Sequence, residues 1–200
     1  MKKKLFWFLF FISIKGYSTT IEGKLYINRG NFKTVNNTYF PFIAFNTDEV
    51  FSPSNSVITA KTGDTLLLKI FNKDTAIHGF SIKNKTIGIS VNPTDSTFVE
   101  LTFIEDGCYI YYDHLTYPNN LYLGLGGMIC ISNSASSKKF YWNIKEHETT
   151  FNNDLINNIN VNWSEYNPDY FTINGLSHPD LQNDSTAHVT SNVGDTIHIF

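Results

Sequence analysis

Short runs of apolar and β-branched residues, separated by turn residues, make up most of the chain. In residues 96–103, Val99, Leu101 and Phe103 alternate with mostly polar residues and share one face, which is typical of a half-buried strand. The predicted strands are 24–28, 56–60, 65–71, 79–83, 96–103, 108–112 and 128–132. Strands of this length and spacing predict an all-β antiparallel sandwich, and a short helix is expected only within residues 151–160.

An internal repeat indicates a second, similar unit. Tyr39-Phe40 recurs as Tyr170-Phe171, and Gly63-Asp64-Thr65 recurs as Gly194-Asp195-Thr196, in both cases 131 residues later. Because the two matches share one offset, they predict a duplicated domain. A period this long corresponds to whole domains in tandem and not to a solenoid.

The repeat divides the chain unequally. The predicted organisation is a signal peptide (1–18), a first domain (19–133), a linker (134–167) and the incomplete start of a second domain (168–200). Strands of an incomplete domain have exposed edges. Either the chain is an incomplete product, or these strands pair with the first domain or with another chain.

The N-terminus carries the signature of export. Three lysines (Lys2-Lys3-Lys4) precede a largely apolar stretch, residues 5–14, and small residues follow at Gly16-Tyr17-Ser18. This layout predicts a periplasmic or extracellular protein. Removal of residues 1–18 takes away four lysines and no acid, so the formal net charge changes from −3 to −7. An acidic product with a single arginine, Arg29, is not expected to bind nucleic acid or, after cleavage of the signal, a membrane.

Histidines are the main candidates for chemistry, because the chain has no phosphate-binding loop and no nucleophile elbow. His78 opens a predicted strand after a turn, and His114 follows another strand at the start of a loop, residues 115–127. Histidines at loop ends of a sandwich suit a copper site. His147 is expected to be a solvated linker residue. The remaining histidines have no partner at short spacing: His178, His188 and His198.

Three segments resemble a known family. The segments 72–82, 107–114 and 126–131 are similar to a cupredoxin domain, and 166–175 with 193–196 resembles the opening of the next domain in multicopper oxidases. The resemblance implies a Greek-key β-sandwich followed by a partial second copy. It also implies copper as the cofactor and oxidoreductase activity.

The copper ligands of that family are only partly present. A blue-copper site needs a thiolate and two imidazoles, but the expected cysteine falls at Asp113, and Cys108 lies too early on its strand. His78 matches one family ligand. His114 matches the second histidine of a His-x-His pair in which Tyr112 replaces the first. The resemblance therefore leaves His78 and His114 as metal ligands and no catalytic residue.

Two hypotheses remain open from the sequence. In the first, the chain is an exported, multicopper-oxidase-related protein with a weak, degenerate copper site, and it has oxidase activity only if the chain continues beyond residue 200. In the second, it is a metal-free structural or interaction module, whose loop 117–127 or sheet edges contact a partner protein or a second copy. Cys108 and Cys130 would lie in an oxidising compartment, where a disulfide and two buried thiols are both consistent with the sequence.

Overall fold

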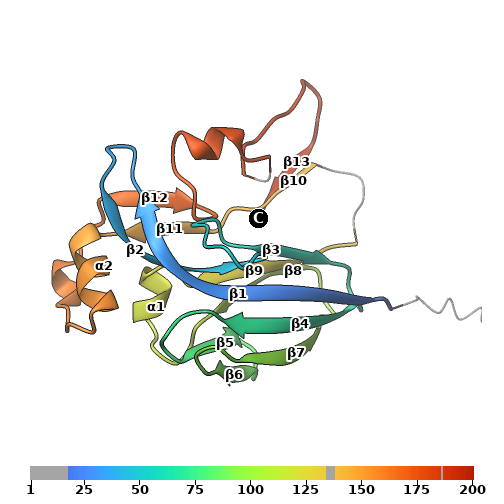
Figure 1. The fold of residues 1–200 in the computed structure, drawn as a ribbon. Helices are drawn as coiled ribbons and strands as arrows, with labels where there is room; N and C mark the ends of the chain where they lie inside the picture. Colours follow the sequence, from blue (N-terminus) through green and yellow to red (C-terminus); the bar gives the residue numbers. More distant parts are fainter. Residues whose placement is uncertain (1–17, 134–137, 186) are drawn as a thin grey trace, which may run out of the picture.

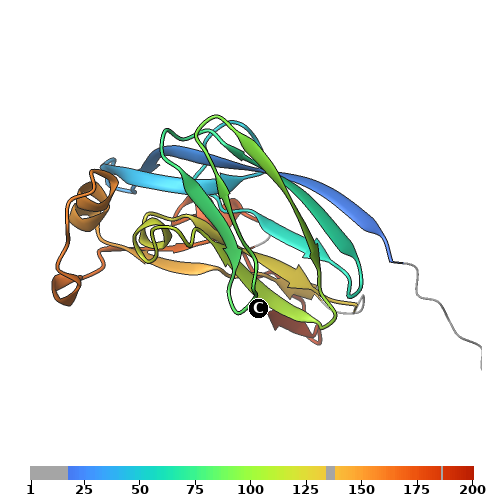
Figure 2. The same ribbon diagram turned by 90° about the horizontal axis from the view of Figure 1, so that it is seen from below.

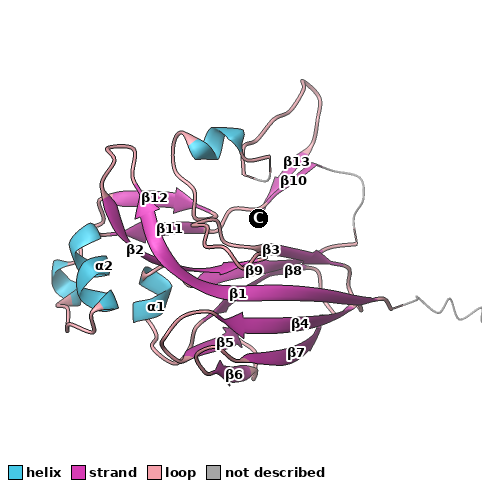
Figure 3. Ribbon diagram, in the orientation of Figure 1, coloured by secondary structure: helices cyan, strands magenta, loops and turns pink. Residues whose placement is uncertain are grey.

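A computed structural model of the chain describes residues 18–133, 138–185 and 187–200. Nine strands build its first part: β1 (Thr20–Lys33), β2 (Tyr39–Asn46), β3 (Val57–Ala60), β4 (Thr65–Asn72), β5 (His78–Ile82), β6 (Gly88–Val91), β7 (Ser96–Thr102), β8 (Gly107–Tyr112) and β9 (Gly126–Ile131). Strands dominate and helices are short (Figure 3). All but the last residue of the predicted signal peptide lies outside the described residues, and export stays a prediction.

The nine strands form two facing sheets, with the orders β2-β1-β4-β7 and β3-β9-β8-β5-β6. The blue strand β1 and the yellow strand β9 lie in different layers when the molecule is seen from below (Figure 2). Because the chain repeatedly crosses between the layers, β1 pairs with β4 and β3 pairs with β9 in parallel. The sandwich therefore contains both parallel and antiparallel strand pairs, whereas the strand pattern predicted antiparallel pairs only.

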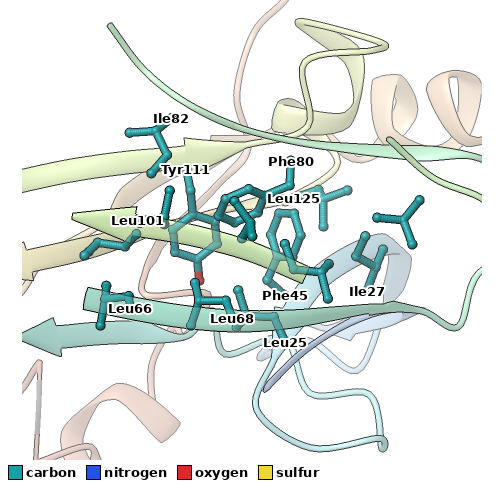
Figure 4. Packing of buried hydrophobic residues seen from close by; sticks show 14 of the residues in the cluster. Leu25, Ile27, Phe45, Leu66, Leu68, Phe80, Ile82, Leu101, Tyr111 and Leu125 are labelled. Carbon is teal, nitrogen blue, oxygen red and sulfur yellow. The ribbon is translucent and has the colours of Figure 1, made fainter. Parts of the chain in front are cut away.

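The core lies between the two sheets and follows the alternation of the sequence. Val99, Leu101 and Phe103 are all buried, as predicted. At the centre, the ring of Tyr111 stacks on Phe80 and meets Phe45 edge-on, with ring centroids 5.3 and 5.2 Å away (Figure 4). This apolar layer provides most of the driving force for closing the sandwich.

The C-terminal part repeats the pairing of the first. Its elements are β10 (Lys138–Phe140), β11 (Ile144–His147), α2 (Thr149–Ile156), η1 (Trp163–Glu165), β12 (Tyr170–Ile173), η2 (Asp180–Asn183) and β13 (Ile197–Ile199). Strand β11 pairs antiparallel with β12 as β1 does with β2, and β10 pairs in parallel with β13 as β1 does with β4. β10, β11 and α2 lie in the segment predicted to be a linker.

The two copies of the Gly-Asp-Thr sequence form the same turn. Asp64 accepts a hydrogen bond from the backbone N–H of Lys61 at 2.9 Å, and Asp195 accepts one from that of Asn192 at 2.8 Å. The glycines before them, Gly63 and Gly194, both have positive φ angles of +87° and +95°. The sequence repeat is thus a repeat of local structure.

The C-terminal part packs against the outer face of the second sheet and the end of the first (Figure 1). His147 is fully buried there, against the rings of Phe40 and Phe42, and its Nδ1 lies 3.0 Å from the backbone oxygen of Tyr122. The prediction that His147 is solvated was wrong, because β11 lies over an aromatic cluster of β2 that the sequence pattern did not reveal. Within the described residues, no helix is long and apolar enough to cross a membrane.

Candidate functional site

His78, the first predicted ligand, lies in a buried polar cluster at one end of the sandwich. Its side chain is 1% exposed. Nε2 lies 2.7 Å from Oδ2 of Asp74, and Nδ1 lies 2.9 Å from Oδ2 of Asp113. Both ring nitrogens face carboxylate oxygens, an arrangement that favours the doubly protonated imidazolium, and Nδ2 of Asn120 also lies 3.2 Å from Nδ1. Burial opposes that charge, but the hydrogen bonds to Asp113 and Asp74 outweigh it and raise the pKa of His78 above 6.5.

The loop before β5 is folded so that Asp74 reaches His78. Asn72, the last residue of β4, accepts a hydrogen bond from the N–H of Asp74 at 2.9 Å and donates to the backbone oxygen of Ala76 at 2.7 Å. This side-chain bridge closes the turn. Asp74 then also accepts from Nη2 of Arg29 on β1, at 2.7 Å.

Asp113, just beyond the end of β8, completes the cluster. Its Oδ1 accepts from the backbone N–H groups of Gly79 and Leu115, at 2.7 and 2.9 Å, and its Oδ2 accepts from the amide of Asn120 at 2.7 Å. Asn120 belongs to α1 (Asn119–Tyr122). Two carboxylates therefore face one imidazolium and one guanidinium, and the cluster is balanced in charge. Burial opposes ionisation of Asp113, but the bonds from His78 and Asn120 prevail and lower its pKa.

His114, the second predicted ligand, lies on the other face of the same sheet. His78 shares its strand face with the core residues Phe80 and Ile82. The His114 ring instead covers Gly79 and Gly88, where an added Cβ would come within 2.6 and 3.3 Å of it. Successive residues of a strand point to opposite faces, so the sheet separates the two imidazoles. Nδ1 of His114 is buried and has no hydrogen-bond partner among the residues that the structure describes.

The sequence pointed to His78 but not to its surroundings. Asp113 was noted only as the residue that replaces a cysteine and Arg29 only as the single arginine, and Asp74 and Asn120 were not singled out. The only sequence signal for them is the polar character of the loops in which Asp74 and Asn120 lie. Loop composition does not indicate that Asp113 meets His78 across 35 residues, or that Arg29 meets Asp74 across 45.

Comparison with solved structures identifies the architecture. A blue copper oxidase from Nitrosomonas europaea has a TM-score of 0.66 and 18% identity over 82% of this chain and 56% of its own. A multicopper oxidase from Pseudomonas thermotolerans has a TM-score of 0.63 and 13% identity over 80% and 42%. A copper nitrite reductase from Nitrosomonas europaea has a TM-score of 0.58 and 14% identity over 70% and 54%. The fold is cupredoxin-like.

The likeness to these proteins is one of structure. No protein-family model matches the chain, and no curated protein matches its sequence. The cupredoxin-like chain spans about half the length of the solved structures it matches.

The cupredoxin-like fold implies copper, but the described residues do not fit that ion. They contain no group of three or more histidine, cysteine, aspartate or glutamate side chains arranged to hold a metal. A metal-bound imidazole needs a free lone pair, and both nitrogens of His78 are hydrogen-bonded to carboxylates. His114 lies across the sheet from it. The role of these two histidines as ligands stays a sequence-based prediction.

The contribution of the cluster to the free energy of unfolding is expected to decrease both at acidic pH and at alkaline pH. The raised pKa of His78 makes its contribution complete below pH 6.5, and the contribution is lost as pH rises through the folded-state pKa. Burial opposes ionisation of Asp74, but the bonds from His78 and Arg29 outweigh it and lower the pKa from 3.8 to about 2. The contribution of Asp74 is therefore complete above pH 3.8 and is lost as pH falls toward 2.

Urea unfolding at a series of pH values tests this. The quantity to compare is the difference in the free energy of unfolding between the wild type and His78→Leu. The difference is needed because His147, whose pKa burial lowers to about 4, titrates in the opposite sense. A difference that is the same at pH 5.5 and at pH 9 would contradict the protonated state of His78.

Proposed function

We propose that this chain is a metal-free, cupredoxin-like structural and interaction module, in which His78 stabilises the fold instead of binding copper. One observation carries the proposal: both ring nitrogens of His78 lie within 2.9 Å of carboxylate oxygens. A histidine held in this way is a cation in an ion-paired cluster. It has no lone pair to offer a metal unless a buried ion pair is first broken.

The cluster is built to hold loops in place. It joins β1, the turn after β4, the start of β5, the end of β8 and α1 through Arg29, Asp74, His78, Asp113 and Asn120. Metal ligands often have the same positional role in small domains. Here, hydrogen-bonded charges fix the loop ends.

The interaction surface of the module is proposed to lie on its sheet edges. The loop around α1, the other candidate, is engaged within the chain at Tyr122, which contacts the rings of Trp163 and Tyr166 with centroids 4.7 and 5.0 Å away, while Tyr117 at its start is 64% exposed. On the edge strand β7, Phe98 is 60% exposed. We place this module outside the cytoplasm, as the predicted signal peptide implies, with a protein or a second copy as partner.

Copper content distinguishes this proposal from a copper protein. Protein purified without added metal is expected to hold far less than one copper per chain by elemental mass spectrometry. Cu(II) added to one equivalent should give the same electron paramagnetic resonance spectrum in the wild type and in His78→Ala. His188→Ala is the matched control, because His188 is exposed and lies far along the chain. Stoichiometric copper that His78→Ala removes and His188→Ala retains would overturn the proposal.

A further inference from the structure

The two cysteines of the chain, Cys108 and Cys130, are direct cross-strand partners. They face each other in the antiparallel register of β8 and β9, between the pairs Gly107–Ile131 and Tyr109–Ile129. Opposed residues of an antiparallel pair have Cα atoms about 4.5–5.5 Å apart. A disulfide spans Cα separations of about 4.4–6.8 Å. Both thiols are free in the structure, and the backbone already has the spacing that a bridge requires.

The two thiols differ in accessibility. Cys130 is 3% exposed, whereas Cys108 is half-buried. Cys130 borders a cavity that it shares with Lys139 and Tyr141 of the C-terminal part, and this part covers the outer face of β9. A reagent in solvent therefore meets Cys108 first.

The two thiols also differ in acidity. The hydrogen bond from Cys130 lowers the pKa of the Cys108 thiol, and burial only partly opposes this. The same hydrogen bond and burial raise the pKa of Cys130. Because the thiolate is the nucleophile in disulfide exchange, chemistry and exposure both select Cys108 as the attacking residue.

We infer that Cys108 and Cys130 form a redox site that closes into a cross-strand disulfide by exchange with a disulfide of a small thiol or of a protein. The Cys108 thiolate attacks one sulfur of the oxidant, whose S–S bond breaks and releases one thiolate. Cys130 then loses its proton to solvent and attacks Sγ of Cys108, and the second oxidant thiolate leaves. Two thiols of the chain are oxidised by two electrons, and one disulfide is reduced to two thiols.

The site is separate from the His78 cluster. The side chains of Cys108 and Cys130 project from the outer face of the sheet, since Tyr109 and Ile129 beside them point into the core. The inference goes beyond the proposed function, and neither depends on the other.

Intact-mass measurement after oxidation tests the inference. The reduced full-length chain is treated with excess oxidised glutathione and then with N-ethylmaleimide. The chain has only two cysteines, so each product has a distinct mass. The wild type is expected to lose the mass of two hydrogens, to take up no maleimide and to regain both thiols with dithiothreitol. Wild type that keeps two alkylatable thiols, or accumulates glutathione adducts, would overturn the inference.

Single substitutions test the order of the two steps. Cys130→Ser is expected to stop at a glutathione adduct on Cys108, because no second thiol can resolve it. Cys108→Ser should form its adduct at least about tenfold more slowly, since Cys130 is buried and less acidic. Equal or reversed rates would overturn the assignment of Cys108 as the attacking thiol. The wild-type measurement decides the disulfide itself even if a variant fails to fold.

Discussion

His78→Leu is expected to lower the free energy of unfolding by about 3–5 kcal/mol, the usual range when one partner of a buried ion pair is removed. The substitution leaves the carboxylates of Asp74 and Asp113 buried without the cation that lies between them. Asp74 still pairs with Arg29, so most of the cost of a buried, unpaired carboxylate falls on Asp113. Urea unfolding near pH 6, where the cluster is fully charged, measures the effect.

Two further variants separate the charge effect from loss of packing. In the double variant with His78→Leu and Asp113→Asn, Asp74 still pairs with Arg29 and no uncompensated charge remains, so recovery of part of the lost stability is expected. His188→Leu makes the same change at an exposed site and should stay within about 0.5 kcal/mol of the wild type. If His78→Leu changed stability as little as His188→Leu, the structural role of His78 would be wrong.

Gly175→Ala is expected to detach the C-terminal part from the first sandwich. Gly175 has a φ of +79°, and a Cβ there would overlap the backbone oxygen of Pro53. The neighbouring Asn174 anchors this contact, because its backbone oxygen accepts from the N–H of Asn55 at 2.8 Å. Left-handed strain alone costs about 1–3 kcal/mol, and the backbone clash requires Pro53 or Gly175 to move. We expect a loss of about 3 kcal/mol or more in the stability of the docked state.

Hydrogen exchange locates that effect. Amides of β11 and β12 should lose protection in Gly175→Ala, while those of β8 and β9 in the first sandwich keep theirs. Gly194→Ala is the matched control, because Gly194 also has a positive φ, of +95°, but a Cβ there meets nothing within 4 Å. Gly194→Ala introduces the left-handed backbone strain without a clash and should lower the free energy of unfolding by about 1–2 kcal/mol. Equal exchange patterns in the two variants would contradict the docking role of Gly175.

Strand prediction succeeded where burial alternates along the strand. It failed at edge strands that are interrupted by proline or are short. β2 was missed because Pro41 interrupts its pattern, but β2 is an edge strand, where a missing N–H is tolerated. β6, with Gly88 at its start, was missed because a short edge strand carries little pattern. α2 begins at Thr149, two residues before the predicted range, because the side chain of Glu148 accepts from the N–H of Phe151 at 3.2 Å.

By itself, the sequence determined the all-β class, the buried face of β7 and the repeated Gly-Asp-Thr turn, because each depends on residues a few positions apart. It also singled out His78. Only the tertiary structure decided what His78 does, because its partner Asp113 comes from a loop 35 residues further along the chain. The same holds for the burial of His147 and for the pairing of Cys108 with Cys130. Local pattern specifies which face of a strand is buried, but only the packing of distant strands decides which polar side chains meet there.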